Sequence, residues 1–379
     1  MAGALDGVLV ADFSRVLAGP YASMLLADLG ATVIKVERPG AGDDTRTWGP
    51  PFSADGQSTY FHAVNRNKRS LALDIGLAAD QRIAQRLAER ADIVLENFKP
   101  GALGRYGLDY RSVFATNPSV IYCSISGFGT GAGADLPGYD LLVQAMGGLM
   151  SITGTDEPTK AGVAVVDVLT GLHATVAILA ALRYRELTGA GQLVEVSLLS
   201  SLLSALVNQA SGYVGAGVIP AFMGNAHPSI APYEVYQTAD RPLVIAVGND
   251  GQFTALATAI NCPHLATDNR FATNPARVAN RSALATELTL ALATEGADHW
   301  RQVLTAVNVP CGPINDVSQA FDLAIELGLD PIAVVGTAAN GAKQVANPVK
   351  YSVTPATYHL SPPLVGQDNA AIIAEFDLI

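Results

Sequence analysis

Three segments at the start of the chain constrain its fold more than any other feature. GVLVADF (residues 7–13) has the apolar pattern of a buried strand, YASMLLADLG (21–30) is typical of a helix closed by glycine, and ATVIKVER (31–38) is typical of a second strand. A strand, a helix and a strand in so short a span form a βαβ unit, whose two strands lie parallel. The sequence therefore predicts an α/β fold with a Rossmann-like parallel sheet.

The same alternation continues to about residue 127. Further strands are expected at 70–75, 92–97 and 118–126, with an amphipathic helix at 81–91. An extended stretch at 161–166 precedes a long helix from Val168 to Leu187, and a turn, a strand and a helix follow within 188–207. From about residue 210 the chain becomes rich in Gly and Pro, which is typical of a linker or loop. Residues 233–248 then have the pattern of a hairpin, with helices after it.

A chain of 379 residues is too long for one core of ordinary size, so two domains are expected. The second is a smaller α+β domain, and a strand-like piece and a helix near the C-terminus are expected to return to the first domain. We place the boundaries as follows: 1–205 for the first part of the large Rossmann-like domain, 206–224 for a linker, 225–325 for the small domain, and 326–379 for a second linker and the returning segment.

Composition excludes several classes of partner. The formal charge is −11, which argues against a general nucleic-acid binder. The apolar fraction of 49% suits a large core or an extensive subunit interface. The most apolar stretch, 161–182, is long enough to cross a membrane, but polar residues interrupt it, so we expect a buried helix and no membrane partner.

Cysteine and histidine usage predicts neither a metal site nor disulfides. The three cysteines, Cys123, Cys262 and Cys311, are widely spaced and form no CxxC pair, and the histidines show no metal-like spacing. The N-terminal segment has no basic leader of the secretory kind. We therefore expect a cytoplasmic protein in a reducing compartment.

The first turn between strand and helix, DFSRVLAGPYAS (12–23), lacks the GxGxxG pattern that lets a pyrophosphate approach a helix. Glu37 ends the second strand where an acid binds ribose in dinucleotide enzymes, but Arg38 and Pro39 follow it. No NAD cofactor is therefore expected. The helix start after Gly19-Pro20 still favours an anion.

Basic residues are few, and several cluster near strand ends, where open α/β sheets bind ligands. Arg38 ends the second strand, and Lys99 and Arg105 follow the strand at 92–97. Arg66, Lys68 and Arg69 precede the strand at 70–75. Any one of these is equally well a solvated loop charge, but the set predicts an anionic, phosphate-bearing ligand.

One acid, Asp167, lies within the apolar stretch KAGVAVVDVLTGLHATV (160–176). A carboxylate in such surroundings costs free energy unless it is compensated. From this segment alone, the simplest interpretation is an N-cap of the long helix. The alternative is a reacting group.

Several stretches together resemble the family III CoA-transferases, the group that includes formyl-CoA transferase and L-carnitine CoA-transferase. Coverage is strong over residues 1–200 and weaker over 225–350. The stretches are DFSRVLAGPYASMLLADLGATVIKVERPGAGDDTR, NRNKRSLALD, ADIVLENFKPGALGRYGLD, PSVIYCSISGFG, PGYDLLVQAMGGLMSITG and GVAVVDVLTGLHATVAILAALRYRELTGAGQLVEVSLL. The resemblance implies a CoA-binding large domain, a small domain and an interlocked homodimer.

The resemblance also implies site residues. The family's nucleophilic aspartate falls on Asp167, and Tyr139 and Asp140 line the same site as supporting residues. The alternatives are a packed aromatic for Tyr139 and a helix-start charge for Asp140. Independently of the resemblance, His227 in GNAHPSIAPY is a possible substrate contact from the small domain. Coenzyme A enters as a substrate, so neither a metal nor another cofactor is implied. The family's CoA-binding positions fall on Val16, Leu17, Arg38, Leu71, Ala72, Leu73, Asn97, Phe98, Lys99, Arg105 and Gly138.

The implied reaction moves CoA from an acyl-CoA thioester to a free carboxylic acid through an aspartyl anhydride and an aspartyl-CoA thioester. Formyl-CoA transferases carry glutamine where this chain has Leu17, and a glycine-rich loop in place of GNAHPSIAPY, so formate and oxalate are not the expected acids. One alternative is an α-methylacyl-CoA racemase, but its GHD motif here is GYD, with Tyr139 in place of the histidine. The other alternative is a non-catalytic CoA-binding protein.

Overall fold

A computed structural model describes residues 3–53, 56–336 and 341–379. These residues form two compact units: a large unit with the chain up to Met150, Lys160–Pro220 and Leu329–Ile379, and a small unit with Ser151–Thr159 and Ala221–Gly328. Residues up to Pro220, part of the expected linker, thus belong to the large unit, where helix α8 (Val207–Ala216) forms. Ser151–Thr159 belongs to the small unit although it interrupts the sequence of the large one.

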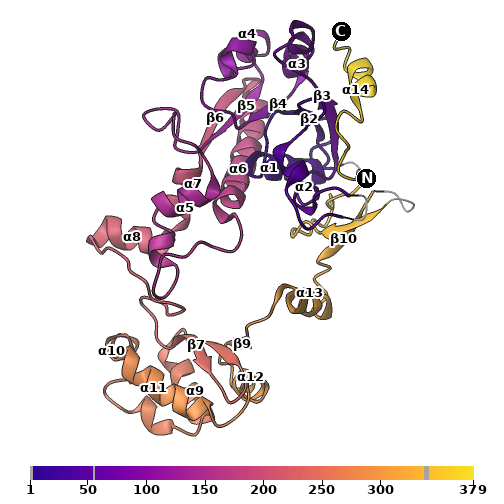
Figure 1. The fold of residues 1–379 in the computed structure, drawn as a ribbon. Helices are drawn as coiled ribbons and strands as arrows, with labels where there is room; N and C mark the ends of the chain where they lie inside the picture. Colours follow the sequence, from indigo (N-terminus) through magenta and orange to yellow (C-terminus); the bar gives the residue numbers. More distant parts are fainter. Residues whose placement is uncertain (1–2, 54–55, 337–340) are drawn as a thin grey trace. The chain divides into compact units, whose positions relative to one another are not determined.

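The large unit is built on a six-stranded parallel sheet in the order β3-β2-β1-β4-β5-β6 (Figure 1). This parallel sheet confirms the predicted α/β fold. The strand order reverses between β1 and β4, and in such sheets ligands bind beyond the carboxyl ends of the strands at the point of reversal. The strands are β1 (Leu9–Asp12), β2 (Thr32–Glu37), β3 (Lys68–Ala72), β4 (Ile93–Glu96), β5 (Ile121–Ser126) and β6 (Gln192–Ser197).

Helices cover both faces of this sheet, which explains why the central strands β1 and β4 are apolar up to their last residues, Asp12 and Glu96. On one face, α1 (Ala18–Asp28) and α6 (Val165–Thr188) pack against alternate strand residues such as Val10 and Leu95. On the other face, α3 (Ala78–Arg90), α4 (Tyr110–Thr116) and α14 (Asn369–Glu375) pack against residues such as Ala11 and Val94.

Helix α6 is the one helix among the described residues that is long and apolar enough to cross a membrane by length and composition. Its buried residues, including Ala174 and Ile178, belong to the core of the large unit. Gly171 allows α6 to approach α1 closely, because a Cβ added there would lie 2.7 Å from the carbonyl oxygen of Ala18. The sequence placed the start of this helix at Val168, but it begins at Val165 with Ala164 as its N-cap.

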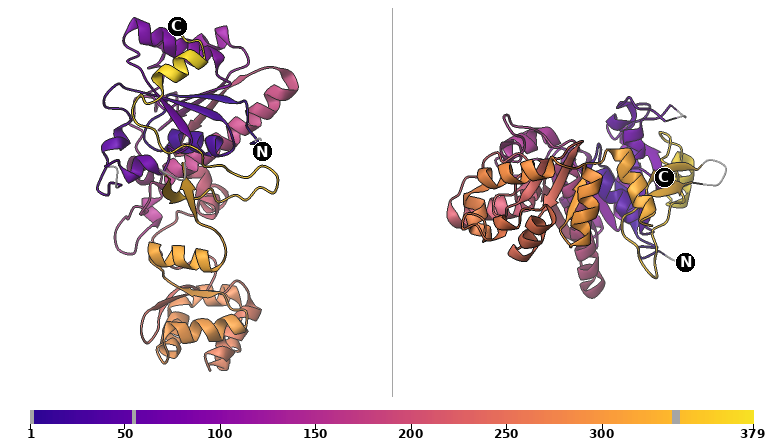
Figure 2. Two further views of the ribbon diagram at one scale, coloured as in Figure 1. Left: turned by 90° about the vertical axis from the view of Figure 1, so that its right-hand side faces the viewer. Right: turned by 90° about the horizontal axis from the view of Figure 1, so that it is seen from below.

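The C-terminal segment lies beside β3 (Figure 2). The N–H of Asn67 donates to the carbonyl of Leu360 at 2.8 Å, the N–H of Ser70 to Asp368 Oδ2 at 2.9 Å, and the N–H of Ala72 to Asn369 Oδ1 at 2.8 Å. Antiparallel strands β10 (Ile332–Val335) and β11 (Ala342–Val345) precede this contact.

The small unit contains an antiparallel sheet of β7 (Tyr233–Gln237), β8 (Pro242–Ala246) and β9 (Cys311–Pro313), which confirms the predicted hairpin. Its core is apolar and includes Phe253 and Trp300. Its helices are α9 (Asp250–Ala259), α10 (Asn274–Ala279), α11 (Arg281–Leu292), α12 (Ala297–Ala306) and α13 (Val317–Glu326). The remaining helices of the large unit are α2 (Thr59–His62), α5 (Asp140–Met146) and α7 (Leu198–Ala205).

Candidate active site

Two adjoining cavities open where the strand order reverses, beside the loops that follow β1 and β4. We call the first, of about 380 Å³, the basic cavity, because Arg15, Arg38 and Arg105 line it. The second, of about 350 Å³, contains Asp167 and is called the aspartate cavity. Arg15 and Phe98 line both cavities, and the Arg15 guanidinium lies 5.4 Å from the centre of the Phe98 ring.

Most of the positions expected to bind CoA line one of these cavities. Arg38, Leu73, Phe98 and Arg105 line the basic cavity. Val16, Leu17, Asn97, Phe98, Lys99 and Gly138 line the aspartate cavity. Leu71 and Ala72 line neither, because the Leu71 side chain is buried in the core and the Ala72 N–H is bonded to Asn369. The structure thus brings together residues from five separate segments of the sequence.

The other basic cluster does not reach these cavities, which corrects its assignment to an anion site. Arg66 is buried and forms a bidentate ion pair with Asp28, at 2.9 Å and 2.7 Å. Lys68 is buried beside Asp12, and Arg69 pairs with Glu375 at 2.7 Å. All three precede or begin β3, so they lie toward the amino end of the strand and away from the site.

Asp167 is the third residue of α6 and is partly buried in the wall of the aspartate cavity. The interpretation of Asp167 as the N-cap is wrong, since Ala164 occupies that position. Asp140 fulfils this role from the start of another helix: its Oδ1 accepts the N–H of Val166 at 2.8 Å and the N–H of Asp167 at 3.2 Å. Within the described residues, the Asp167 carboxylate itself accepts no hydrogen bond, which leaves it available to a ligand.

The electrostatic surroundings of Asp167 disfavour its ionised form. Burial, with a contribution from the negative charge of Asp140, raises the pKa of Asp167 to about 7. Asp140 is held in turn by Gln144, whose Nε2 donates to its Oδ2 at 2.6 Å, and Gln144 Oε1 accepts the N–H of Ala161. A carboxylate with a pKa so close to neutrality is a stronger nucleophile than an ordinary surface aspartate.

Tyr60, which the sequence did not identify, lies near both acids. Burial raises the pKa of the Tyr60 hydroxyl to about 12, with further contributions from the charges of Asp167 and Asp140. Its ring packs in a small apolar cluster around Leu17, and the Trp48 ring meets it edge-on at 5.4 Å. Tyr60 belongs to a single helical turn capped by Ser58. That capping pattern was the only available signal, and it says nothing about the distant aspartates.

A second buried acid, Glu96, supports the loop after β4. Its carboxylate accepts the N–H of Phe98 at 2.8 Å and a hydrogen bond from Ser124. Burial raises its pKa to about 7, although both hydrogen bonds oppose this shift. Glu96 therefore fixes the backbone of Phe98, which lines both cavities.

The other predicted site residues are placed as follows. Tyr139 lines the aspartate cavity and is 63% exposed. Gly138 packs against Gly127 so closely that a Cβ on it would lie 2.7 Å from the Gly127 Cα. His227 belongs to the small unit, where its Nδ1 accepts the N–H of Ser229 at 3.1 Å. Its contact with substrate stays a prediction.

Among the described residues, no group of three or more His, Cys, Asp and Glu side chains is arranged to hold a metal ion. The polar groups at the site are instead guanidinium and ammonium groups, backbone N–H groups and the Asp167 carboxyl. Such a set suits the phosphates of a nucleotide at one end and an acyl group at the other.

The chain is similar to known proteins over nearly its whole length. The sequence profile of CoA-transferase family III matches residues 5–369. The succinate–glutarate CoA-transferase of Agrobacterium fabrum is 46% identical over 99% of this chain and 96% of its own length. The acetyl-CoA:oxalate CoA-transferase of Acetobacter aceti is 42% identical over 92% of this chain and 90% of its own length. A crystal structure of a CAIB/BAIF family protein from Brucella suis superposes with a TM-score of 0.88 at 44% identity, covering both chains completely.

Proposed function

The chain belongs to CoA-transferase family III and is a CoA-transferase, and on this premise we propose that it moves CoA from succinyl-CoA to a five-carbon dicarboxylic acid such as glutarate. The choice of acids is supported by the relative named for succinate and glutarate, which is 46% identical over 99% of the chain. A relative named for oxalate is 42% identical. The absence of glutamine at position 17 therefore does not by itself remove oxalate from the acids to be tested.

The observation that carries the mechanism is the Asp167 carboxyl, which lines the cavity adjoining the basic one and accepts no hydrogen bond from the described residues. We place the adenosine phosphates of CoA beside Arg38 and Arg105, and the thioester in the aspartate cavity. Lys99 pairs with the exposed Asp135 at 2.8 Å. Exposed ion pairs are weak, so a phosphate can displace this one.

In the first half-reaction, an oxygen of the Asp167 carboxylate attacks the carbonyl carbon of the acyl-CoA, and the carbon–sulfur bond breaks. The products are a mixed anhydride and CoA thiolate. The thiolate then attacks the aspartyl carbonyl carbon and releases the donor acid as its carboxylate. An aspartyl-CoA thioester remains on Asp167.

In the second half-reaction, the acceptor carboxylate attacks the aspartyl carbonyl carbon and displaces the thiolate. The thiolate then attacks the acceptor's carbonyl carbon in the new anhydride, which gives the product thioester and restores the Asp167 carboxylate. Each tetrahedral intermediate carries an oxyanion. The N–H groups of Leu17, Ala18 and Gly19 at the start of α1 have no acceptor among the described residues, and no side chain caps this helix. They are suitable donors for such an oxyanion.

We further propose that the protein is a homodimer. Large apolar side chains are exposed on helices of the large unit. Val176 on α6 is 65% exposed, and Val214 on α8 is 83% exposed. Large apolar side chains exposed on several elements support an interaction surface of the kind that subunit interfaces use. Light scattering after gel filtration tests this proposal, and a monomer at micromolar concentration contradicts it. The cytoplasmic location likewise stays a prediction.

The racemase alternative requires a histidine base where this chain has Tyr139. Tyrosine is a much weaker base at neutral pH. A purely CoA-binding role is not supported, since the relatives are named as transferases over nearly the full chain.

The test of the proposed reaction incubates the enzyme with succinyl-CoA and glutarate and follows glutaryl-CoA by chromatography. Hydroxylamine or borohydride added during turnover should modify Asp167, as mapped by mass spectrometry. Asp167→Asn and Asp167→Ala should lose transfer. Glu186→Gln, which alters an exposed acid on the same helix, should retain it. Transfer that survives both substitutions at Asp167 contradicts the mechanism.

A further inference from the structure

The turn that follows β1 lines both cavities, yet none of its polar backbone groups from the N–H of Ser14 to the N–H of Val16 is satisfied by a helix or a strand. Four side chains satisfy them instead. Asp12 Oδ1 accepts the N–H of Ser14 at 2.9 Å, and Lys35 Nζ donates to the carbonyl of Ser14 at 3.1 Å. The turn is therefore held from outside, and its position depends on these side chains.

The next residue is held by a single amide. Asn97 Oδ1 accepts the N–H of Arg15 at 2.8 Å, and Asn97 Nδ2 donates to the carbonyl of Arg15 at 2.7 Å. This reciprocal pair joins the loops after β1 and β4 across the point where the strand order reverses. Both the oxygen and the nitrogen of the Asn97 amide are thus bonded to the turn, although the residue lines the aspartate cavity.

Val16 adopts a strained conformation at the end of the turn. Its φ is +69°, in the left-handed region that a β-branched residue rarely adopts. Both carboxylate oxygens of Asp43 lie 3.3 Å from its N–H. Strain of this kind persists only where surrounding contacts over-determine the backbone, and it is concentrated at functional sites.

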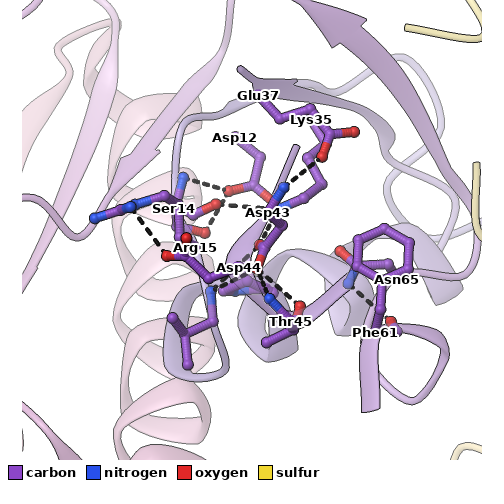
Figure 3. A network of polar contacts seen from close by, with 12 residues as sticks. Asp12, Ser14, Arg15, Lys35, Glu37, Asp43, Asp44, Thr45, Phe61 and Asn65 are labelled. Atoms are coloured by element: carbon purple, nitrogen blue, oxygen red, sulfur yellow. Dashed lines mark hydrogen bonds and ion pairs between the residues drawn. The ribbon is translucent and has the colours of Figure 1, made fainter. Parts of the chain in front are cut away.

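The two charged clamps, Lys35 and Asp43, form a buried ion pair at 2.8 Å in which both side chains are 0% exposed (Figure 3). Asp43 also accepts the N–H and the hydroxyl of Thr45, at 3.0 Å and 2.7 Å. Burial raises the pKa of Asp43, but Lys35 and the Thr45 hydrogen bonds outweigh this effect and hold it at about 2. The Asp43 carboxyl is thus ionised throughout the working pH range. Neither Lys35 nor Asp43 lines the basic or the aspartate cavity.

From this geometry we propose that the Lys35–Asp43 pair is a positioning element for acyl transfer: with Asn97 it holds the Arg15–Leu17 turn, and hence the unpaired N–H groups at the start of α1, in register with Asp167. This proposal rests on the transferase reaction described above. A buried ion pair is costly to form and is often replaceable by apolar residues without loss of stability. A role in placing backbone groups explains why the Lys35–Asp43 pair is present although neither residue lines a cavity.

The test uses the double variant Lys35→Met/Asp43→Leu, which removes both charges and keeps similar volume, so that no unpaired charge is left buried. We expect kcat for CoA transfer to fall about 10- to 100-fold, because a displacement of the order of 1 Å has effects of this size. The KM for acyl-CoA should stay within about threefold of the wild-type value, since the basic cavity holds most of the CoA.

A second readout does not depend on activity. The Arg15–Val16 bond is a trypsin site within the clamped turn, and the double variant should become cleavable there, with a new N-terminus at Val16 detected by mass spectrometry. Arg185→Gln is the matched control, because it breaks another partly buried ion pair, the one between Arg185 and Asp92 at 3.0 Å. Asp92 directly precedes β4, so this pair lies at the amino ends of the strands, opposite to the two cavities. This control should change neither kcat nor trypsin resistance.

The possible results separate cleanly. A double variant with kcat within threefold of wild type overturns the proposal, whether or not Arg15 becomes cleavable. If kcat falls but the bond after Arg15 stays fully resistant to trypsin, the turn has not been released, and the proposal that the ion pair acts by holding the turn is contradicted. If the wild-type protein transfers CoA to none of the acids tested, the proposed function is refuted. The role of the Lys35–Asp43 pair in holding the turn is still tested in that case, because trypsin cleavage after Arg15 does not depend on activity.

Discussion

The carboxylate of Asp140 accepts a hydrogen bond from the backbone N–H of Asp167, so one acid holds the first helical turn that presents the other. The same negative charge contributes to the raised pKa of Asp167. Asp140 thus affects both the position and the protonation of the proposed nucleophile, and these two effects have different experimental signatures.

Asp140→Asn should lower the pKa of Asp167. The amide keeps an oxygen that accepts the two N–H groups but removes the like charge, so the Asp167 carboxylate becomes easier to ionise. The acid limb of kcat/KM against pH, centred near pH 7 in the wild type, should move to lower pH. Asp109→Asn, which changes a capping aspartate on α4, should leave the midpoint in place. An unchanged midpoint in Asp140→Asn would show that another group controls this limb.

Asp167→Asn should make the protein more stable at high pH. The folded-state pKa of about 7 lies above the usual value, so the free energy of unfolding falls as pH rises from about 4 to about 7. The substitution removes this loss. With allowance for partial exposure, we expect a gain of roughly 1 kcal/mol at pH 8 and a smaller one at pH 5. Urea titrations at the two pH values measure it, and an equal gain at both would rule out ionisation of Asp167 as the cause.

Arg38→Gln and Arg105→Gln should raise the KM for acyl-CoA about 10-fold each, with kcat nearly unchanged. Each substitution removes one charged donor to a phosphate without altering the aspartate cavity. The effect should shrink at high salt. Steady-state kinetics at two ionic strengths provide the measurement, with Arg69→Gln as the control, because Arg69 pairs with Glu375 outside both cavities. A fall in kcat alone would place these arginines elsewhere in the reaction.

Gly171→Ala should destabilise the large unit by about 1–3 kcal/mol, although alanine is the better helix former. The new Cβ would lie 2.7 Å from the Ala18 carbonyl and 3.1 Å from the Tyr21 ring, which forces α6 away from α1. Gly212→Ala on α8, where a Cβ meets nothing within 4 Å, should be neutral or slightly stabilising. Thermal unfolding of the pair of variants compares the two cases. Equal stability in both would mean that the α1–α6 contact relaxes without cost.

Local patterns predicted the sheet well because its strands are buried on both faces. The apolar runs around Val10, Val33 and Val94 mark strands directly, and Gly30 and Gly189 mark the ends of α1 and α6. The start of α6 was misplaced by three residues for a physical reason. Its capping acid, Asp140, lies 27 residues upstream of Asp167, and a cap from another helix leaves no local signature.

The sequence also could not predict which charged side chains are buried in ion pairs. Lys35 lies in the middle of the strand TVIKVE, where alternation alone does not show whether a lysine faces water or an acid. Its partner, Asp43, is positioned by Glu37, which accepts the N–H of Asp43 at 2.9 Å. Lys68 was predicted to contact an anionic ligand, but it donates to Asp12 and to the carbonyl of Pro20 inside the protein. Only the folded arrangement distinguishes a structural cation from one that binds ligand.

The pairing of β3 with residues 360–369 has a consequence for the order of events during synthesis. The backbone N–H groups of Asn67, Ser70 and Ala72 obtain their acceptors from the last twentieth of the chain. When the first strands leave the ribosome, that side of the sheet has no partner, and the whole small unit must be translated before one arrives. The sheet edge is therefore exposed until residues 360–369 have been translated, and the large unit cannot close before that point.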